Sequence, residues 1–205
     1  MPIQLHISGG TGNAAVYGSL GGKRSSIQVT NNELENIFDN ISRQEALIGK
    51  TEYRCLYVYN PSGSALTNVR IIISQHPSVS NISLGIDSAG VGNGTSTGIA
   101  TSIASEDTIP SGVTFYGESE DYYEVALGTL KAGEGIAFWL KRQAETSSAQ
   151  VISWTLTITE DAGTLPSTSH ADGLSVTEWR DLDTTTTGTY TIGGVVSKIG
   201  FSDVG

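Results

Sequence analysis

The sequence predicts an all-β protein, an antiparallel β-sandwich with one short helix. Between residues 51 and 160, apolar residues recur at every second position, which is the period of a half-buried strand. Gly, Pro, Asn and Ser interrupt these runs at short intervals, as turns between strands require. Six or so strands with this spacing suit a two-sheet sandwich of the Ig-like or jelly-roll kind, with extended arms at both ends.

The strongest strand patterns lie in the central block. Residues 53–59 are aromatic and β-branched, which favours a strand, and turns are predicted at residues 60–63 and 131–134. Five further runs alternate in polarity, and their expected inward residues are Val69, Ile71 and Ile73; Ile82, Leu84 and Ile86; Tyr123, Val125 and Leu127; Ile136, Phe138 and Leu140; and Ile152, Trp154, Leu156 and Ile158.

One helix of one or two turns is predicted after Ser42. Ser42 and Glu45 have the spacing of a capping box, and Gly49 stands where a left-handed residue ends a helix. The apolar residues ahead of it predict either helix or an extended segment that delivers Phe38 to the core. They are Leu34, Ile37, Phe38 and Ile41.

Composition divides the chain into three parts: an arm at residues 1–32, a sandwich at 33–161, and a linker with a β-hairpin or arm at 162–205. The first part is rich in Gly, and its only charged residues are Lys23 and Arg24. Such a segment buries little by itself, so we expect it to become ordered on another surface, including a neighbouring subunit. Residues 87–110 exceed an ordinary loop, which predicts a functional loop or one docked on a partner.

Charge and hydropathy exclude several partners. Twenty-one acidic and 11 basic residues give a net charge of −10, which repels a phosphate backbone and argues against nucleic-acid binding. No apolar run reaches the length of a membrane span, and the amino terminus lacks the pattern of a secretory signal. Synthesis in a cytoplasm is therefore expected. The single Cys55 lies within a strand pattern, which predicts a buried thiol.

The sequence offers little that could carry out catalysis. His6, His76 and His170 have no second His or Cys at the spacing of a metal site, and no G-x-S-x-G elbow occurs. A catalytic triad assembled only by the fold would leave no such signal. The glycines at residues 9–12 lack the Lys of a phosphate-binding loop. We expect no enzymatic activity and no cofactor.

Four carboxylates gather near residue 120: Glu118, Glu120, Asp121 and Glu124. Paired carboxylates serve glycosidases, and clustered ones bind calcium. This cluster lacks the spacing of an EF-hand and begins a predicted strand, so solvated surface charges are the favoured interpretation.

Exposed tryptophans are the best candidates for an interaction site. Trp139 has the opposite parity to Phe138 and Leu140, so it is expected to face outward, as is Trp179. An outward Trp suits a sugar platform or a subunit interface, and the interface is favoured. The predicted interaction residues are Trp139, Trp179, Arg180, Lys23 and Arg24.

Several segments of the central block form a recognisable pattern: IFDNIS at 37–42, EYRCLYVYN at 52–60, LTNVRIII at 66–73, ISLGID at 82–87, LKAGE at 130–134 and FWLKR at 138–142. With Glu45, Ala46 and Gly49, they make residues 35–160 resemble uncharacterised virion proteins of tailed bacteriophages. These motifs are structural rather than catalytic. The two ends of the chain lie outside the resemblance.

This resemblance implies a non-enzymatic structural protein of the virion, made in the host cytoplasm. A capsid decoration subunit and a tail or baseplate component are both expected roles, and the negative charge and small size favour decoration. The implied partners are major capsid or tail proteins and further copies of the chain. The alternative is a receptor- or carbohydrate-binding module that uses residues 87–110 with Trp139 or Trp179.

Overall fold

The computed structural model describes residues 3–29, 36–75, 81–118, 120–144 and 151–161, and the strands at 170–179, 187–192 and 195–200. Side chains are described in residues 3–29, 36–75, 81–118, 120–144 and 154–160. Among the described residues, no helix has the length and apolar character needed to cross a membrane.

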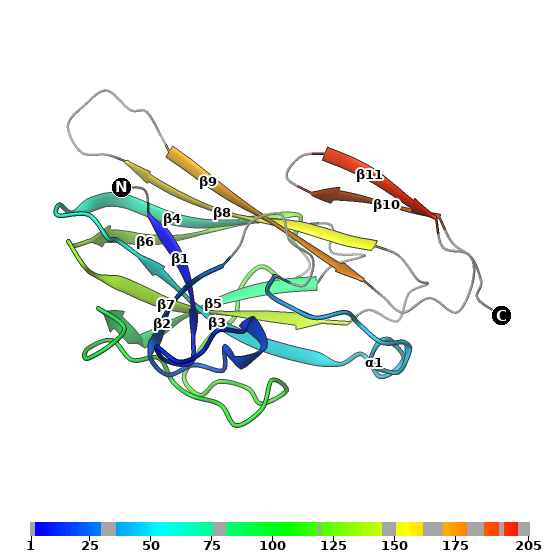
Figure 1. The fold of residues 1–205 in the computed structure, drawn as a ribbon, viewed down its shortest axis with the longest axis horizontal. Helices are drawn as coiled ribbons and strands as arrows, with labels where there is room; N and C mark the ends of the chain where they lie inside the picture. The colour runs from blue at the N-terminus through cyan, green and yellow to red at the C-terminus, as the bar shows by residue number, and fades with distance from the viewer. Residues whose placement is uncertain are drawn as a thin grey trace.

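Two antiparallel sheets stack on each other (Figure 1), which confirms the predicted all-β sandwich. The five-stranded sheet has the order β2-β1-β3-β7-β5, and the four-stranded sheet has the order β6-β4-β8-β9. The first sheet comprises β1 (Gln4–Ser8), β2 (Arg24–Gln28), β3 (Thr51–Tyr59), β5 (Asn81–Gly92) and β7 (Gly135–Gln143). The second comprises β4 (Leu66–Ser74), β6 (Tyr122–Leu130), β8 (Val151–Asp161) and β9 (His170–Trp179).

From β3 to β7, each strand is followed by a strand of the other sheet. Consecutive strands in this series therefore do not pair: β3 and β5 both pair with β7, while β6 and β8 both pair with β4. The predicted turn at residues 131–134 connects β6 to β7, and the Glu134 amide donates to the Lys131 carbonyl at 3.0 Å. The sandwich is thus held together by pairings between distant parts of the sequence.

The main core lies between the two sheets and is built from alternate residues of each strand. Most of the inward residues expected from the sequence are buried: Val69, Ile71, Ile73, Ile82, Leu84, Tyr123, Ile136, Phe138, Leu140, Trp154, Leu156 and Ile158. Ile86, Val125 and Leu127 are only partly buried against this core. The side chain of Ile152 lies outside the described residues.

The helix α1 (Arg43–Ile48) has the predicted caps. The Ser42 hydroxyl accepts from the Glu45 amide at 3.2 Å, and Glu45 accepts from the Ser42 amide at 2.8 Å. Gly49 ends the helix with a φ of 64°. Ile37, Phe38 and Ile41 lie in a non-helical segment and are buried, so the chain delivers Phe38 to the core as the second alternative predicted. Leu34 falls outside the described residues.

Residues 3–29, in the segment predicted to become ordered on another surface, are ordered on the sandwich of the same chain. β1 lies between β2 and β3, and it pairs with β3 from Gln4 opposite Tyr59 to Ile7 opposite Leu56. Ile7 of β1 and Ile3, which precedes the strand, are buried in the main core. The Gly-rich stretch between β1 and β2 continues this attachment, because the Cys55 amide donates to the Ser19 carbonyl at 2.8 Å. The segment is ordered by its own chain because its backbone completes the edge of β3.

The carboxy-terminal part contributes further strands. β9 pairs along β8 and extends the four-stranded sheet. β10 (Thr187–Ile192) and β11 (Val195–Gly200) form a separate antiparallel hairpin. The predicted linker falls largely on residues 162–169, which lie outside the described residues.

Residues 93–118 form a third layer, which we call the covering loop, on the outer face of the five-stranded sheet. Its residues Ala100, Ile103, Val113 and Phe115 pack on a second apolar cluster formed by Tyr53, Cys55, Tyr57, Ala137 and Trp139. Gly85 permits this approach, since a Cβ there would overlap Val113 and lie 2.7 Å from the Thr114 carbonyl oxygen. The long loop is therefore docked on its own sheet.

Two glycines test how firmly the first 29 residues are attached to the covering loop. Gly10 and Gly21 have similar positive φ values, 86° and 88°, so alanine strains the backbone equally, by about 1–2 kcal/mol. A Cβ at Gly21 would overlap the Thr101 carbonyl oxygen, whereas one at Gly10 meets nothing within 4 Å. Gly21→Ala should therefore lower the free energy of unfolding by about 3 kcal/mol or more. Urea unfolding followed by circular dichroism measures both, and equal losses in the two variants would contradict this attachment.

Candidate functional site

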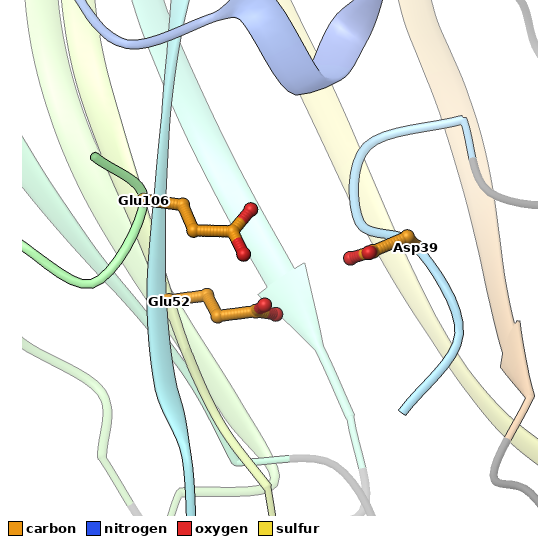
Figure 2. A group of neighbouring side chains, drawn as sticks. All are labelled: Asp39, Glu52 and Glu106. Atoms are coloured by element: carbon orange, nitrogen blue, oxygen red, sulfur yellow. The ribbon is translucent and has the colours of Figure 1, made fainter. Parts of the chain in front are cut away.

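Three carboxylates from different parts of the chain converge at one end of β3. Asp39 lies before α1, Glu52 lies on β3 and Glu106 lies in the covering loop. Figure 2 shows their carboxyl groups pointing toward one another. One oxygen from each lies within 4.8 Å of the others. This is the only such convergence of potential metal ligands in the part of the chain that the structure describes.

Lysine and arginine side chains fill the space between these carboxylates. Lys50 Nζ lies 2.8 Å from Glu52 and from Glu106, and 2.7 Å from Glu45 of α1. Arg54 Nη2 lies 2.6 Å from the second oxygen of Glu106. We call these residues, with Asp39 and Arg142, the ion-pair network.

Arg142 connects the network to β7. Its Nη2 donates to Glu52 and lies 3.4 Å from an Asp39 oxygen, while its Nη1 donates to the Asp39 carbonyl at 2.6 Å. The guanidinium carbon lies 4.7 Å from the centre of the Phe38 ring, and that of Arg54 lies 5.6 Å from it. Arg54 and Arg142 are 0% and 3% exposed, so their charges depend on these partners.

The electrostatics favour the charged forms of Glu106 and Lys50. Burial favours a higher pKa for Glu106, but hydrogen bonds from Lys50 and Arg54 lower this pKa to about 2. For Lys50, burial acts to lower the pKa, but hydrogen bonds to Glu106, Glu45 and Glu52 raise it above its ordinary value. Groups with pKa values so far from 7 do not exchange protons readily at that pH, so this geometry does not suit general acid or base catalysis.

The donor set does not fit a metal ion. Calcium prefers several free carboxylate oxygens. Here both oxygens of Glu106 and both oxygens of Glu52 already face a cationic side chain. An ion at the centre would have to displace Lys50. The arrangement instead ties together four segments of the fold: α1 with its preceding loop, β3, β7 and the covering loop.

The carboxylates that the sequence singled out do not form this site. Glu118, Glu120, Asp121 and Glu124 are exposed. Glu118 pairs with Lys141 at 3.0 Å, and Glu124 pairs with Arg70 at 2.7 Å. The network escaped sequence analysis because its members are far apart in the chain. One signal was present: Glu52 and Arg54 share the parity of the inward residues of β3, as Arg142 does on β7.

The prediction that Trp139 faces outward to a partner was wrong. Its parity is opposite to that of Phe138, as expected, but the covering loop buries it completely. Its indole Nε1 donates to Asp87 Oδ2 at 3.1 Å, and the same oxygen accepts from the Thr101 amide at 2.8 Å. Trp139 therefore anchors the covering loop. Cys55 lies in the same cluster, which confirms the predicted buried thiol.

Of the other predicted interaction residues, the structure describes the side chains of Lys23 and Arg24. Lys23 is exposed. Arg24 stacks over Tyr59, with its guanidinium carbon 3.7 Å from the ring centre, and its Nε donates to the Asn93 carbonyl at 3.3 Å. Trp179 ends β9, but its side chain and all of Arg180 lie outside the described residues.

His6 is the histidine whose side chain the structure describes. It is buried, and its Nδ1 lies 3.0 Å from the Ser25 carbonyl oxygen. Burial lowers the pKa of His6 to about 4, with a smaller contribution from the charge of Arg24. A neutral ring held in this way between β1 and β2 contributes to packing.

Comparisons with known proteins do not place the chain in a family. No family model and no curated protein matches it. Among solved structures, the N-terminal domain of PorA is 12% identical, with 87% of this chain and 97% of that chain covered and a TM-score of 0.38. The collagen-binding subdomain ACE19 of the Enterococcus faecalis surface protein ACE is 8% identical, with 65% and 91% covered and a TM-score of 0.34.

A family 123 glycoside hydrolase from Clostridium perfringens is 11% identical, with a TM-score of 0.32. The match covers 71% of this chain but only 23% of the hydrolase. Likenesses this distant carry no argument about function.

We expect the ion-pair network to make the stability of the fold depend on pH, and we expect substitution of Glu106 to reduce the free energy of unfolding. Because the folded-state pKa of Glu106 is lowered from 4.5 to about 2, its contribution is complete above about pH 4.5 and is lost as the pH falls toward 2. Glu106→Gln should lower the free energy of unfolding at pH 7 by about 2 kcal/mol, since buried Arg54 loses its charged partner. Urea titrations at pH 7 and pH 3 should show this loss shrinking at the lower pH.

Asp107→Asn is the matched control, because Asp107 is the exposed neighbour of Glu106. It should leave the unfolding midpoint at pH 7 near that of the unsubstituted protein. A loss for Glu106→Gln that is equally large at pH 7 and pH 3 would show that Glu106 acts through packing rather than charge.

Trp139 should matter for stability. Trp139→Ala removes the centre of the second cluster and should lower the free energy of unfolding by about 3–5 kcal/mol. Trp139→Phe retains much of the ring packing but removes the bond to Asp87, so a loss of about 1–2 kcal/mol is expected. Urea unfolding followed by circular dichroism distinguishes the two. An unchanged midpoint for Trp139→Ala would contradict its anchoring role.

Proposed function

We propose that the chain is a non-enzymatic structural subunit of a tailed-bacteriophage virion. Its place would be a capsid decoration subunit or a component of the tail or baseplate. The resemblance of residues 35–160 to virion proteins supports this proposal. Its partners would be a major capsid or tail protein and further copies of the chain, without a cofactor, a nucleic acid or a membrane.

One structural observation carries the proposal. The long loop and the converging carboxylates could have formed a reactive or ligand-binding site, but their contacts stabilise the fold. The long loop is packed on the five-stranded sheet through Trp139 and Asp87. The converging carboxylates are paired with Lys50, Arg54 and Arg142. A body stabilised in this way offers a rigid shape, which suits repeated assembly contacts.

The structure changes how such a subunit would be held. Residues 3–29 contribute β1 and β2 to the five-stranded sheet, so this segment is held by its own chain. Assembly contacts would instead come from the outer surfaces and sheet edges. Trp139 is fully buried, so it cannot form a sugar-binding surface. The carbohydrate-binding alternative would therefore depend on Trp179.

Purified particles provide the direct test. Virions from a host that carries the coding sequence should contain the chain when analysed by mass spectrometry after density-gradient purification. Antibody labelling viewed by electron microscopy should mark the capsid for a decoration subunit and one end of the tail for a baseplate component. Absence of the chain from purified particles would overturn the proposal.

A further inference from the structure

Strand β6 forms an open edge of the four-stranded sheet. In the part of the chain that the structure describes, β4 is the only strand that pairs with it. Its neighbour β4 is covered on the other side by β8, so β6 alone presents its outer backbone groups at this edge. Unpaired backbone groups along an edge strand are a template for pairing with another strand.

The side chains of β6 leave this edge accessible. Val125 and Leu127 face the core but are only partly buried, so the core is incomplete at this edge. On the outer face, Ala126 is small and exposed. Gly128, which pairs with the inward-facing Val69, is also exposed, and a Cβ at Gly128 would meet nothing within 4 Å. Glu124 is the one charged residue of β6, and Arg70 pairs with it at 2.7 Å.

These residues favour one register with a second copy of β6. In a two-fold antiparallel pair centred on Val125, Val125 lies opposite itself and Glu124 lies opposite Ala126. Tyr123 then lies opposite Leu127, which continues the apolar inner face across the pair, and exposed Tyr122 lies opposite Gly128. Centring the pair on Glu124 would instead place two carboxylates opposite each other, which is unfavourable.

We propose that β6 pairs with β6 of a second copy of this chain in the register centred on Val125. The two four-stranded sheets then become one continuous sheet across a two-fold axis. The contact is self-complementary, as a two-fold interface requires. This contact is a specific mode of the self-association included in the proposed function. The contact itself does not depend on that function, and only its place in a particle does.

The bulge next to Ala126 limits the strength of this contact. Arg70 pairs with Ala126 while the next residue of β4, Val69, pairs with Gly128, so Leu127 is an extra residue in β6. Regular pairing therefore covers a short stretch, and the interface falls below the roughly 1,200–2,000 Å² of a stable complex. The dimer forms at high protein concentration, as in a crowded particle.

Two opposite charges at Ala126 test the register. Because Ala126 lies opposite Glu124 of the second copy, Ala126→Glu creates two repulsive pairs and Ala126→Lys creates two attractive ones. Sedimentation equilibrium of the purified full chain from about 10 μM to 1 mM should show a dimer that Ala126→Glu weakens at least about fivefold. Ala126→Lys should bind as tightly as the unsubstituted chain or more tightly. Thermal melting monitors that each variant is folded.

Cross-linking provides a second readout that does not depend on affinity. Val125→Cys should form a disulfide-linked dimer on mild oxidation, because the two Val125 Cβ atoms lie about 4.5–5.5 Å apart in this register. Thr129→Cys is the control, since its two copies lie about 27 Å apart at the rise of a strand. Native Cys55 is fully buried and does not compete.

A chain that stays monomeric at 1 mM, equal effects of the two charges, or equal cross-linking of the two cysteine variants would each overturn this proposal. These measurements use the isolated chain, so they are independent of whether it occurs in virions. A dimer found for a chain that is absent from particles would support the β6 contact and reject the proposed function.

Discussion

Strand β3 is buried on both of its faces, and the rest of the structure follows from this constraint. Every residue from Glu52 to Val58 is buried. The even-numbered residues face the four-stranded sheet, while Tyr53, Cys55 and Tyr57 face the opposite side. A strand with two apolar faces needs a layer on each side. The four-stranded sheet provides one layer, and the covering loop provides the other.

The covering loop is held by polar groups because it lacks the regular pairing of a sheet. Asp87 accepts hydrogen bonds from Trp139 and from the Thr101 amide, which fixes the loop over the middle of the sheet. The Tyr57 hydroxyl accepts from the Ala100 amide at 2.8 Å. At the end of β3, Glu106 joins the loop to Lys50 and Arg54. Buried polar groups with partners specify one position for a segment that apolar packing alone would leave loose.

This arrangement uses most of the polar features of the candidate site to hold the interior together. The network and the tryptophan that sequence analysis regarded as an interaction residue both stabilise the fold. The amino-terminal strands close one edge of the five-stranded sheet. A short contact between Tyr116 and Leu84 protects part of the other edge, at β5. In the part of the chain that the structure describes, no such contact protects β6 apart from its bulge and Glu124, and we propose that a second copy extends the sheet there.

The sequence by itself determined the features that depend on neighbours along the chain. Alternation identified the strands and their inward residues, such as Ile71 and Leu156, because side chains on a strand have a period of two. The spacing of Ser42, Glu45 and Gly49 identified α1 and both of its caps, because capping depends on residues within two turns.

Only the tertiary structure decided which segments meet. The strands β3 to β8 have no hairpins among them, so no short turn in the sequence reveals their pairing partners. Because pairing partners cannot be recognised from the sequence, the Gly-rich start was predicted to be an arm. Its backbone in fact completes the edge of β3. Trp139 was predicted to be exposed because parity shows which face of the sheet a residue occupies. Parity does not show what covers that face. The ion-pair network joins Asp39, Glu52, Glu106 and Arg142, which are far apart in the sequence. Charged residues show no periodic pattern that would predict which of them pair in the fold.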